Sequence, residues 1–130
     1  MKTIRLLILE DDLEVLSLIM GKLFKIEEKD KSLCFSVAVL SEYSQVETYI
    51  NGHPEIKYDI LILDRDDKVG GSFHVADLKN FDLDKVIAIS SVPEYNAQAE
   101  KAGVKKVVLK DFSNLELFIN NVIEYINHII

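Results

Sequence analysis

Acidic side chains gather in two short segments of this chain, residues 10–14 and residues 59–67. The formal net charge is −7, and these two segments together carry the whole excess. Carboxylates such as those of Glu10, Asp11 and Asp64 repel one another when they are held close together, unless a cation neutralises them. Neither segment contains a histidine or a cysteine, so the available ligands are oxygens, which favour Mg²⁺ over zinc. One carboxylate of such a site can also act as a nucleophile and accept a phosphoryl group.

A hydroxyl and an ammonium group are placed in a similar way along the chain. Ser90 follows the apolar run 86–89, and Lys110 follows the run 104–109. A lysine can neutralise the oxygens of a phosphoryl group, and a hydroxyl can donate a hydrogen bond to one of them. Either residue alone would most simply be a solvated turn residue. Together with the acids, however, they predict a site for phosphoryl transfer.

Five short apolar runs predict the strands that would bring these residues together: 4–9, 34–39, 60–63, 86–89 and 104–109. Runs of this length, rich in isoleucine and valine, fit strands covered on both faces, as in a parallel sheet. Helices are predicted between and after them, over residues 13–23, 43–50, 73–80, 93–102 and 115–126. Asp11 and Ser113 are predicted as N-terminal caps, and Gly103 as the end of the fourth helix. The alternation predicts one α/β domain over residues 1–130, built on a doubly wound five-stranded parallel sheet.

Such a sheet predicts where the site lies. Ligands of open parallel sheets bind beyond the carboxyl ends of the strands, where the strand order reverses. Glu10 and Asp11 follow the first predicted strand, and Asp64 follows the third. If these two strands are neighbours, as in the order 2-1-3-4-5, the two acidic segments meet in space.

Four segments resemble motifs of the response-regulator receiver domains of two-component signalling: residues 7–12, 58–64, 86–91 and 102–112. The resemblance extends over the whole chain. It implies a flavodoxin-like (βα)5 fold with strand order 2-1-3-4-5. It also implies that Asp64 is the phosphoacceptor, and that Ser90 and Lys110 contact the phosphoryl group. The implied Mg²⁺ ligands are Glu10, acting through water, Asp11, Asp64 and the backbone carbonyl of Asp66.

Three positions depart from the receiver pattern. The loop 65–71 has no proline and carries two additional acids, Asp111 follows Lys110 where the family has a cis-proline, and Val107 stands in place of a common aromatic residue. The usual coupling between hydroxyl and aromatic residue is therefore absent, and another surface must carry the signal. The side chain of Asp66 could face solvent, lie beside the phosphoryl group or reach the metal. Val92 offers no polar group to orient water, which predicts slow hydrolysis of the phosphoryl-aspartate.

The resemblance implies a histidine kinase or a phosphotransfer protein as the phosphoryl donor and a downstream protein as the target. Because no output domain lies within the 130 residues, we expect a diffusible signal carrier that catalyses only its own phosphorylation and dephosphorylation. An acidic chain without a basic stripe argues against direct binding of nucleic acid. No apolar run approaches the roughly 18 residues of a membrane span, so a cytoplasmic location is expected. The face formed by the last two helices and the last strand could also support a homodimer.

Two other functions fit parts of the pattern. A receiver-like domain that has lost phosphorylation would act only as a protein-binding module. The segment 61–66 also resembles the Asp-x-Asp motif of haloacid-dehalogenase-type phosphatases. That motif should open its domain, however, and the pair Glu10 and Asp11 has no role in such a phosphatase.

Overall fold

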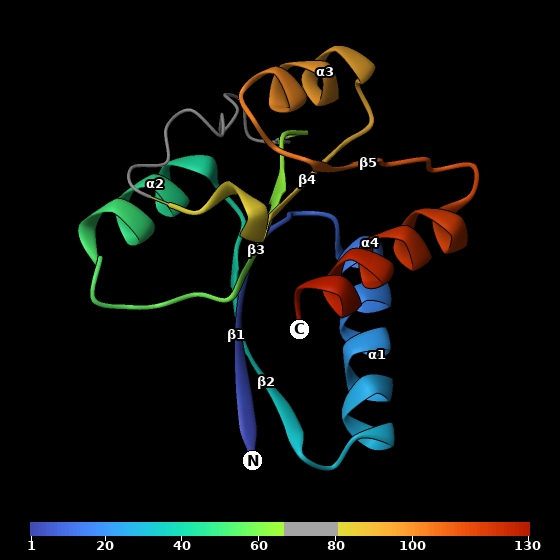
Figure 1. Ribbon diagram of the computed structural model, residues 1–130. Coiled ribbons are helices and arrows are strands. Elements are labelled where there is room, and N and C mark those ends of the chain that lie inside the picture. The colour runs from blue at the N-terminus through green and yellow to red at the C-terminus, as the bar shows by residue number, and fades with distance from the viewer. Residues whose placement is uncertain (67–80) are drawn as a thin grey trace.

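The computed structural model describes residues 1–66 and 81–130 and contains one five-stranded parallel sheet (Figure 1). The strands of the sheet are β1 (Lys2–Leu9), β2 (Leu33–Leu40), β3 (Ile60–Asp64), β4 (Val86–Ser90) and β5 (Lys106–Leu109). Their spatial order is β2-β1-β3-β4-β5, and every neighbouring pair is parallel. The predicted doubly wound, flavodoxin-like α/β fold with order 2-1-3-4-5 is therefore confirmed.

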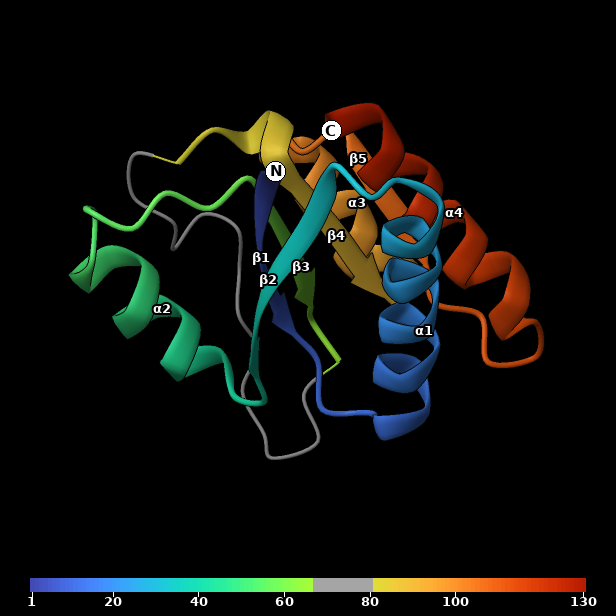
Figure 2. The same cartoon turned by 90° about the horizontal axis from the view of Figure 1, so that it is seen from below.

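Within residues 1–66 and 81–130, four α-helices cover the two faces of this sheet: α1 (Leu13–Lys29), α2 (Tyr43–Gly52), α3 (Pro93–Lys101) and α4 (Leu115–Ile129). A 3₁₀ turn, η2 (Leu83–Lys85), precedes β4. Helices α1 and α4 lie side by side on one face of the sheet, and α2 and α3 lie on the other (Figures 1 and 2). The helix predicted over residues 73–80 lies outside the described residues. No helix of the described ranges has the length and apolar character needed to cross a bilayer.

Alternation along the central strands divides the core into two layers. In β1, Leu6 and Ile8 pack in the layer under α1 and α4, whereas Leu7 and Leu9 pack in the layer under α2 and α3. All four side chains are buried. Because both faces of the strand are covered, a continuous apolar run replaces the polar alternation of a half-exposed strand. This rigid double layer holds the ends of the central strands in place.

The strand register brings the predicted site residues to one edge of the sheet, the carboxyl edge. Leu9 pairs with Leu63, so Glu10 and Asp64 follow on neighbouring strands. Asp64 in turn pairs with Ile89, the residue before Ser90. The amide of Lys110 donates to the carbonyl of Ser90. Four strands thus end at the same level, each with a polar residue at its end.

Two of the predicted helix caps are wrong by one residue. The first helix is capped by Asp12, whose side chain accepts from the amide of Val15, and not by Asp11. The last helix is capped by Asn114, because the amide and hydroxyl of Ser113 both donate to Asp111. Gly103 ends the helical segment as predicted, with a φ of 109°, a conformation that favours glycine.

Candidate functional site

The carboxylate of Glu10 is anchored at the start of the first helix. It is 1% exposed, and its Oε2 accepts from the amides of Asp11 and Asp12 at 2.9 and 3.0 Å. These amides belong to the turn before α1, where backbone donors lack helical partners. Its other oxygen, Oε1, lies 2.7 Å from Nζ of Lys110. Oε2 is therefore held by two hydrogen bonds, whereas Oε1 has the ion-pair contact but accepts no well-directed hydrogen bond among the described residues.

Asp64 lies on the neighbouring strand and shares the same lysine. Its Oδ1 is 3.0 Å from Nζ of Lys110 and accepts from the amide of Asp66 at 2.9 Å. Asp64 is 5% exposed and Lys110 is 3% exposed. Together with Glu10 they form the buried triad, two acids that face one ammonium group.

The buried triad has an unbalanced charge. Burial and the nearby carboxylate of Glu10 raise the pKa of Asp64 to about 8, although Lys110 opposes this rise. Burial disfavours the charged form of Lys110, but Asp64 and Glu10 outweigh it and raise the pKa of the lysine. Near neutral pH, Asp64 therefore shares the triad largely as the neutral acid. A divalent cation at this place would favour its ionised form.

Three carboxylates at the carboxyl edge have the geometry of a cation site. One oxygen each of Glu10, Asp11 and Asp64 lies within 4.8 Å of the others. A small pocket beside them has a volume of ≈ 10 Å³, about the size of one water molecule. Besides these acids, Ser41 and Tyr43 line this pocket. An all-oxygen donor set with an uncompensated buried acid fits a hard divalent cation such as Mg²⁺.

The hydroxyl of Ser90 has two partners at the end of β4. It donates to Oδ1 of Asp66 at 2.6 Å and accepts from the amide of Val92 at 2.9 Å. The amide of Ser91 donates to the other oxygen of Asp66, also at 2.6 Å. The Asp66 side chain therefore bridges two donors of the loop after β4. The sequence left three positions open for this side chain: in solvent, beside the phosphoryl group or at the metal. In the structure it contacts Ser90, one of the residues expected to contact the phosphoryl group.

Arg65 connects the loop after β3 to the third helix. Its guanidinium lies 4.4 Å from the ring centroid of Tyr95 and donates to the side chain of Gln98. The side-chain amide of Asn96 also reaches this region, where its Nδ2 donates to the carbonyl of Ser90. Helix α3 is thus tied to both strand ends of the site.

The structure brings together Glu10, Asp11, Asp64 and Lys110, and it places Ser90 on the adjacent strand end. The role of the Asp66 backbone carbonyl stays a prediction. Sequence reasoning did not find Ser41, Tyr43 or the amide of Ser91. The signal for Ser41 and Tyr43 was their position just after the second strand, at the same edge of the sheet as the acids.

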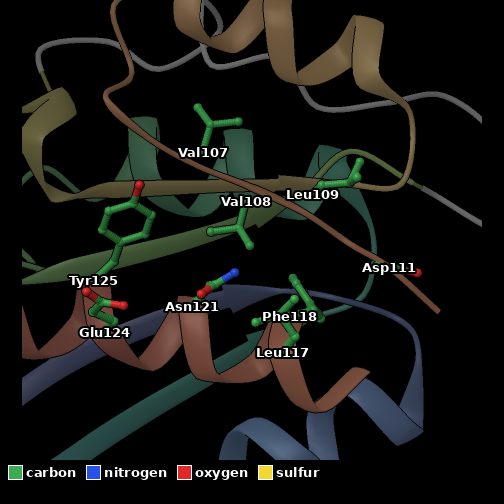
Figure 3. A pocket seen from close by; sticks show the side chains of 9 residues that line it. All are labelled: Val107, Val108, Leu109, Asp111, Leu117, Phe118, Asn121, Glu124 and Tyr125. Atoms are coloured by element: carbon green, nitrogen blue, oxygen red, sulfur yellow. The ribbon is translucent and has the colours of Figure 1, made fainter. Parts of the chain in front are cut away.

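The position predicted to lack the common aromatic residue lies on the last strand. Val107 and Val108 point to opposite faces of β5 (Figure 3). Val107 packs against the α2–α3 core layer, and Val108 belongs to the α1–α4 layer. A groove of ≈ 400 Å³ lies between β5 and α4, and two half-exposed leucines, Leu109 and Leu117, line it.

The peptide bonds of the described residues, including the one between Lys110 and Asp111, are trans.

Comparisons with known proteins identify the fold by structure and not by sequence. No protein-family model matches the chain, and no curated protein matches it significantly in sequence. Among solved structures, the chain is similar to the Mn²⁺-bound form of the response regulator Rcp1, with a TM-score of 0.59 and 11% sequence identity. The similarity covers 91% of this chain and 90% of the other. The chain therefore has the doubly wound α/β fold of a response regulator, with a buried acidic cluster at the carboxyl edge of its sheet.

Proposed function

We propose that this chain is a receiver domain in which Asp64 accepts a phosphoryl group with the help of a bound divalent cation, most naturally Mg²⁺. The observation that carries the proposal is the buried triad. Lys110 contacts both Asp64 and Glu10 within 3.0 Å, and a third carboxylate lies beside them. A purely structural ion pair would balance its charges, since burying a surplus carboxylate is costly. The surplus acid is what a cation would neutralise.

In this proposal the acidic residues bind the cation in two ways, directly and through water. Asp11, Asp64 and the backbone carbonyl of Asp66 are the direct ligands of the cation, and Glu10 acts through water. Oε2 of Glu10 already accepts two backbone hydrogen bonds and Oε1 faces Lys110, which supports the indirect role. When bound, the cation would stabilise negative charge on the phosphoryl oxygens.

Besides the bound cation, the transfer needs residues of this chain and a phosphorylated donor. A carboxylate oxygen of Asp64 attacks the phosphorus atom, and the bond from phosphorus to the donor nitrogen or oxygen breaks with its electron pair leaving on the donor. Lys110 is positioned to neutralise a phosphoryl oxygen on the residue that it already contacts. The hydroxyl of Ser90 donates to another oxygen of the group. Phosphate is released in a separate hydrolysis, in which water attacks the phosphorus atom and the bond from phosphorus to the Asp64 oxygen breaks, with its electron pair left on the carboxylate.

The phosphoryl donor in this proposal is a histidine kinase or a phosphotransfer protein. The target is a protein that distinguishes the phosphorylated from the unphosphorylated form. The conformational change is a shift between two populations of the loops around Asp64. The groove between β5 and α4 is a surface on which a target or a second copy of the chain could dock.

Intact mass spectrometry after incubation with Mg²⁺ and a small acyl phosphate tests this function. The protein should gain the mass of one phosphoryl group, and removal of Mg²⁺ with EDTA should abolish the gain. The variant Asp64→Asn should gain nothing, whereas Glu14→Gln, an exposed acid near the same edge, should behave as the unmodified protein does. Absence of any gain would instead favour a protein-binding module.

A phosphatase is the competing chemical function, since Asp64 and Asp66 also form an Asp-x-Asp pair. The side chain of Asp66, which would be the general acid of such a phosphatase, instead accepts hydrogen bonds from Ser90 and Ser91. A parallel assay with a chromogenic phosphate ester separates the two. Sustained ester turnover that Asp64→Asn abolishes would support the phosphatase and overturn the receiver proposal.

A further inference from the structure

We propose that the Asp66 carboxylate is an internal anion that occupies the phosphoryl-binding donors of the resting protein, and that a phosphoryl group on Asp64 must displace it. This inference rests on the proposed function, because it concerns what happens at Ser90 and Ser91 when Asp64 is modified. It adds an autoinhibitory contact to the site. The contact belongs to this chain's own loop, where an acid stands two residues after Asp64.

The geometry of Asp66 is that of a bound anion. Its two carboxylate oxygens accept separately from the Ser90 hydroxyl and the Ser91 amide, both at 2.6 Å. These are short, charge-assisted hydrogen bonds, which are about twice as strong as neutral ones. A hydroxyl and a backbone amide that converge on one carboxylate are the same donors that a phosphoryl oxygen would use at this strand end.

The Ser90 hydroxyl has no second proton to offer an incoming group. It accepts from the amide of Val92 and donates its single proton to Asp66. Ser90 is 1% exposed, so solvent cannot easily supply a substitute partner. A phosphoryl oxygen can therefore receive this hydrogen bond only after Asp66 releases it.

The two negative groups also compete by charge. The backbone amide of Asp66 donates to Oδ1 of Asp64 at 2.9 Å, and this hydrogen bond holds the two residues close together. A phosphoryl group attached to Asp64 brings additional negative charge next to the half-buried Asp66 carboxylate, and like charges repel. Repulsion and competition for donors both act to expel the Asp66 side chain.

Expulsion of Asp66 would reach the third helix through its neighbour. Arg65 stacks on Tyr95 and bonds Gln98, so a movement of the 65–66 backbone changes contacts with α3. The predicted signal path therefore runs from Asp64 through Asp66 and Arg65 to α3. It does not require the aromatic residue that Val107 replaces.

The contact itself can be tested without phosphorylation, by ¹H–¹⁵N NMR of the metal-free protein. The variant Asp66→Ala removes both hydrogen bonds and keeps the backbone carbonyl. The Ser91 amide resonance should shift strongly and exchange faster with solvent in Asp66→Ala, and Glu14→Gln should leave it unchanged. A Ser91 amide that neither shifts nor loses protection in Asp66→Ala would overturn the inference whatever the fate of the proposed function.

The second measurement is the rate of Asp64 phosphorylation by a small acyl phosphate at saturating Mg²⁺. Loss of the internal anion should raise this rate on the order of tenfold, since one charged hydrogen bond is worth about a factor of ten or more. Asp66→Asn keeps one acceptor oxygen without the charge, so its phosphorylation rate should lie between those of the unmodified protein and Asp66→Ala. An unchanged or slower rate in Asp66→Ala would overturn the autoinhibitory role while phosphorylation of the unmodified protein upholds the proposed function. If neither protein is phosphorylated, the proposed function fails and the inference fails with it.

Discussion

Replacing Asp64 by asparagine should stabilise the metal-free protein, although Asp64 is the proposed reactive residue. The reason is the surplus charge of the buried triad, in which Glu10 and Asp64 face a single lysine. Folding raises the pKa of Asp64 from 3.8 to about 8. The folded protein thus binds this proton more tightly than the unfolded chain does. The free energy of unfolding must then fall as the pH rises from about 4 to about 8.

The size of the effect follows from this shift. At pH 7 about three of the four pKa units are realised, and at 1.36 kcal/mol per unit this amounts to roughly 4 kcal/mol of lost stability. Asparagine cannot ionise and avoids this loss. It also alters the contact of this side chain with Lys110 at 3.0 Å, which offsets part of the gain. We therefore expect Asp64→Asn to be more stable by about 1–3 kcal/mol at pH 7.

Urea unfolding in EDTA at pH 5 and pH 8 measures this difference directly. The advantage of Asp64→Asn should widen with pH, by as much as about 4 kcal/mol over this interval. Saturating Mg²⁺ should reverse the order, since a ligand at 100 times its Kd stabilises the folded state by about 2.7 kcal/mol and the variant lacks one ligand. The exposed control Glu14→Gln should change stability by less than about 0.5 kcal/mol at both pH values. A variant Asp64→Asn that is less stable than the unmodified protein at pH 8, or a difference in stability that does not depend on pH, would refute the charge argument.

Three further variants test other parts of the account. Lys110→Met leaves the two buried acids without their cation and should lower the free energy of unfolding by about 3–5 kcal/mol in urea titrations at pH 7.5; a loss below about 1 kcal/mol would mean that the triad behaves as a surface ion pair. Asp12→Ala should lower it by about 1 kcal/mol through loss of the α1 cap, and a larger loss in Asp11→Ala would contradict the observed cap. Val92→Gln places a polar group two residues after Ser90 and should shorten the half-life of the phosphorylated protein, measured by loss of the added mass; an unchanged half-life would count against the role given to Val92.

The fold and the positions of the main site residues were predictable because each rests on a strong local signal. Apolar runs covered on both faces identify the strands, and a parallel sheet brings all their carboxyl ends to one edge. This geometry places Asp64 beside Glu10 and Lys110 without any knowledge of side-chain contacts. The spacing of residues along the chain was sufficient for this part of the site.

The details that escaped prediction depend on choices between neighbouring groups of the same chemistry. Asp11 and Asp12 offer the same capping carboxylate, and the choice between them depends on Glu10, which accepts from both of their amides. In the same way, Ser113 could have capped α4 had Asp111 not engaged it. The position of the Asp66 side chain depends on two donors that follow a different strand. Such contacts arise from tertiary packing and leave no periodic pattern in the sequence.

The central claim is that one carboxylate of the buried triad becomes phosphorylated, and mapping the modified residue tests it most directly. The protein would be treated with Mg²⁺ and an acyl phosphate, reduced with borohydride to convert the acyl phosphate into a stable alcohol, and digested for peptide sequencing by mass spectrometry. We predict a single reduced residue, at position 64. Reduction at Glu10, at Asp11 or at Asp66, or no reduced residue at all, would contradict the account.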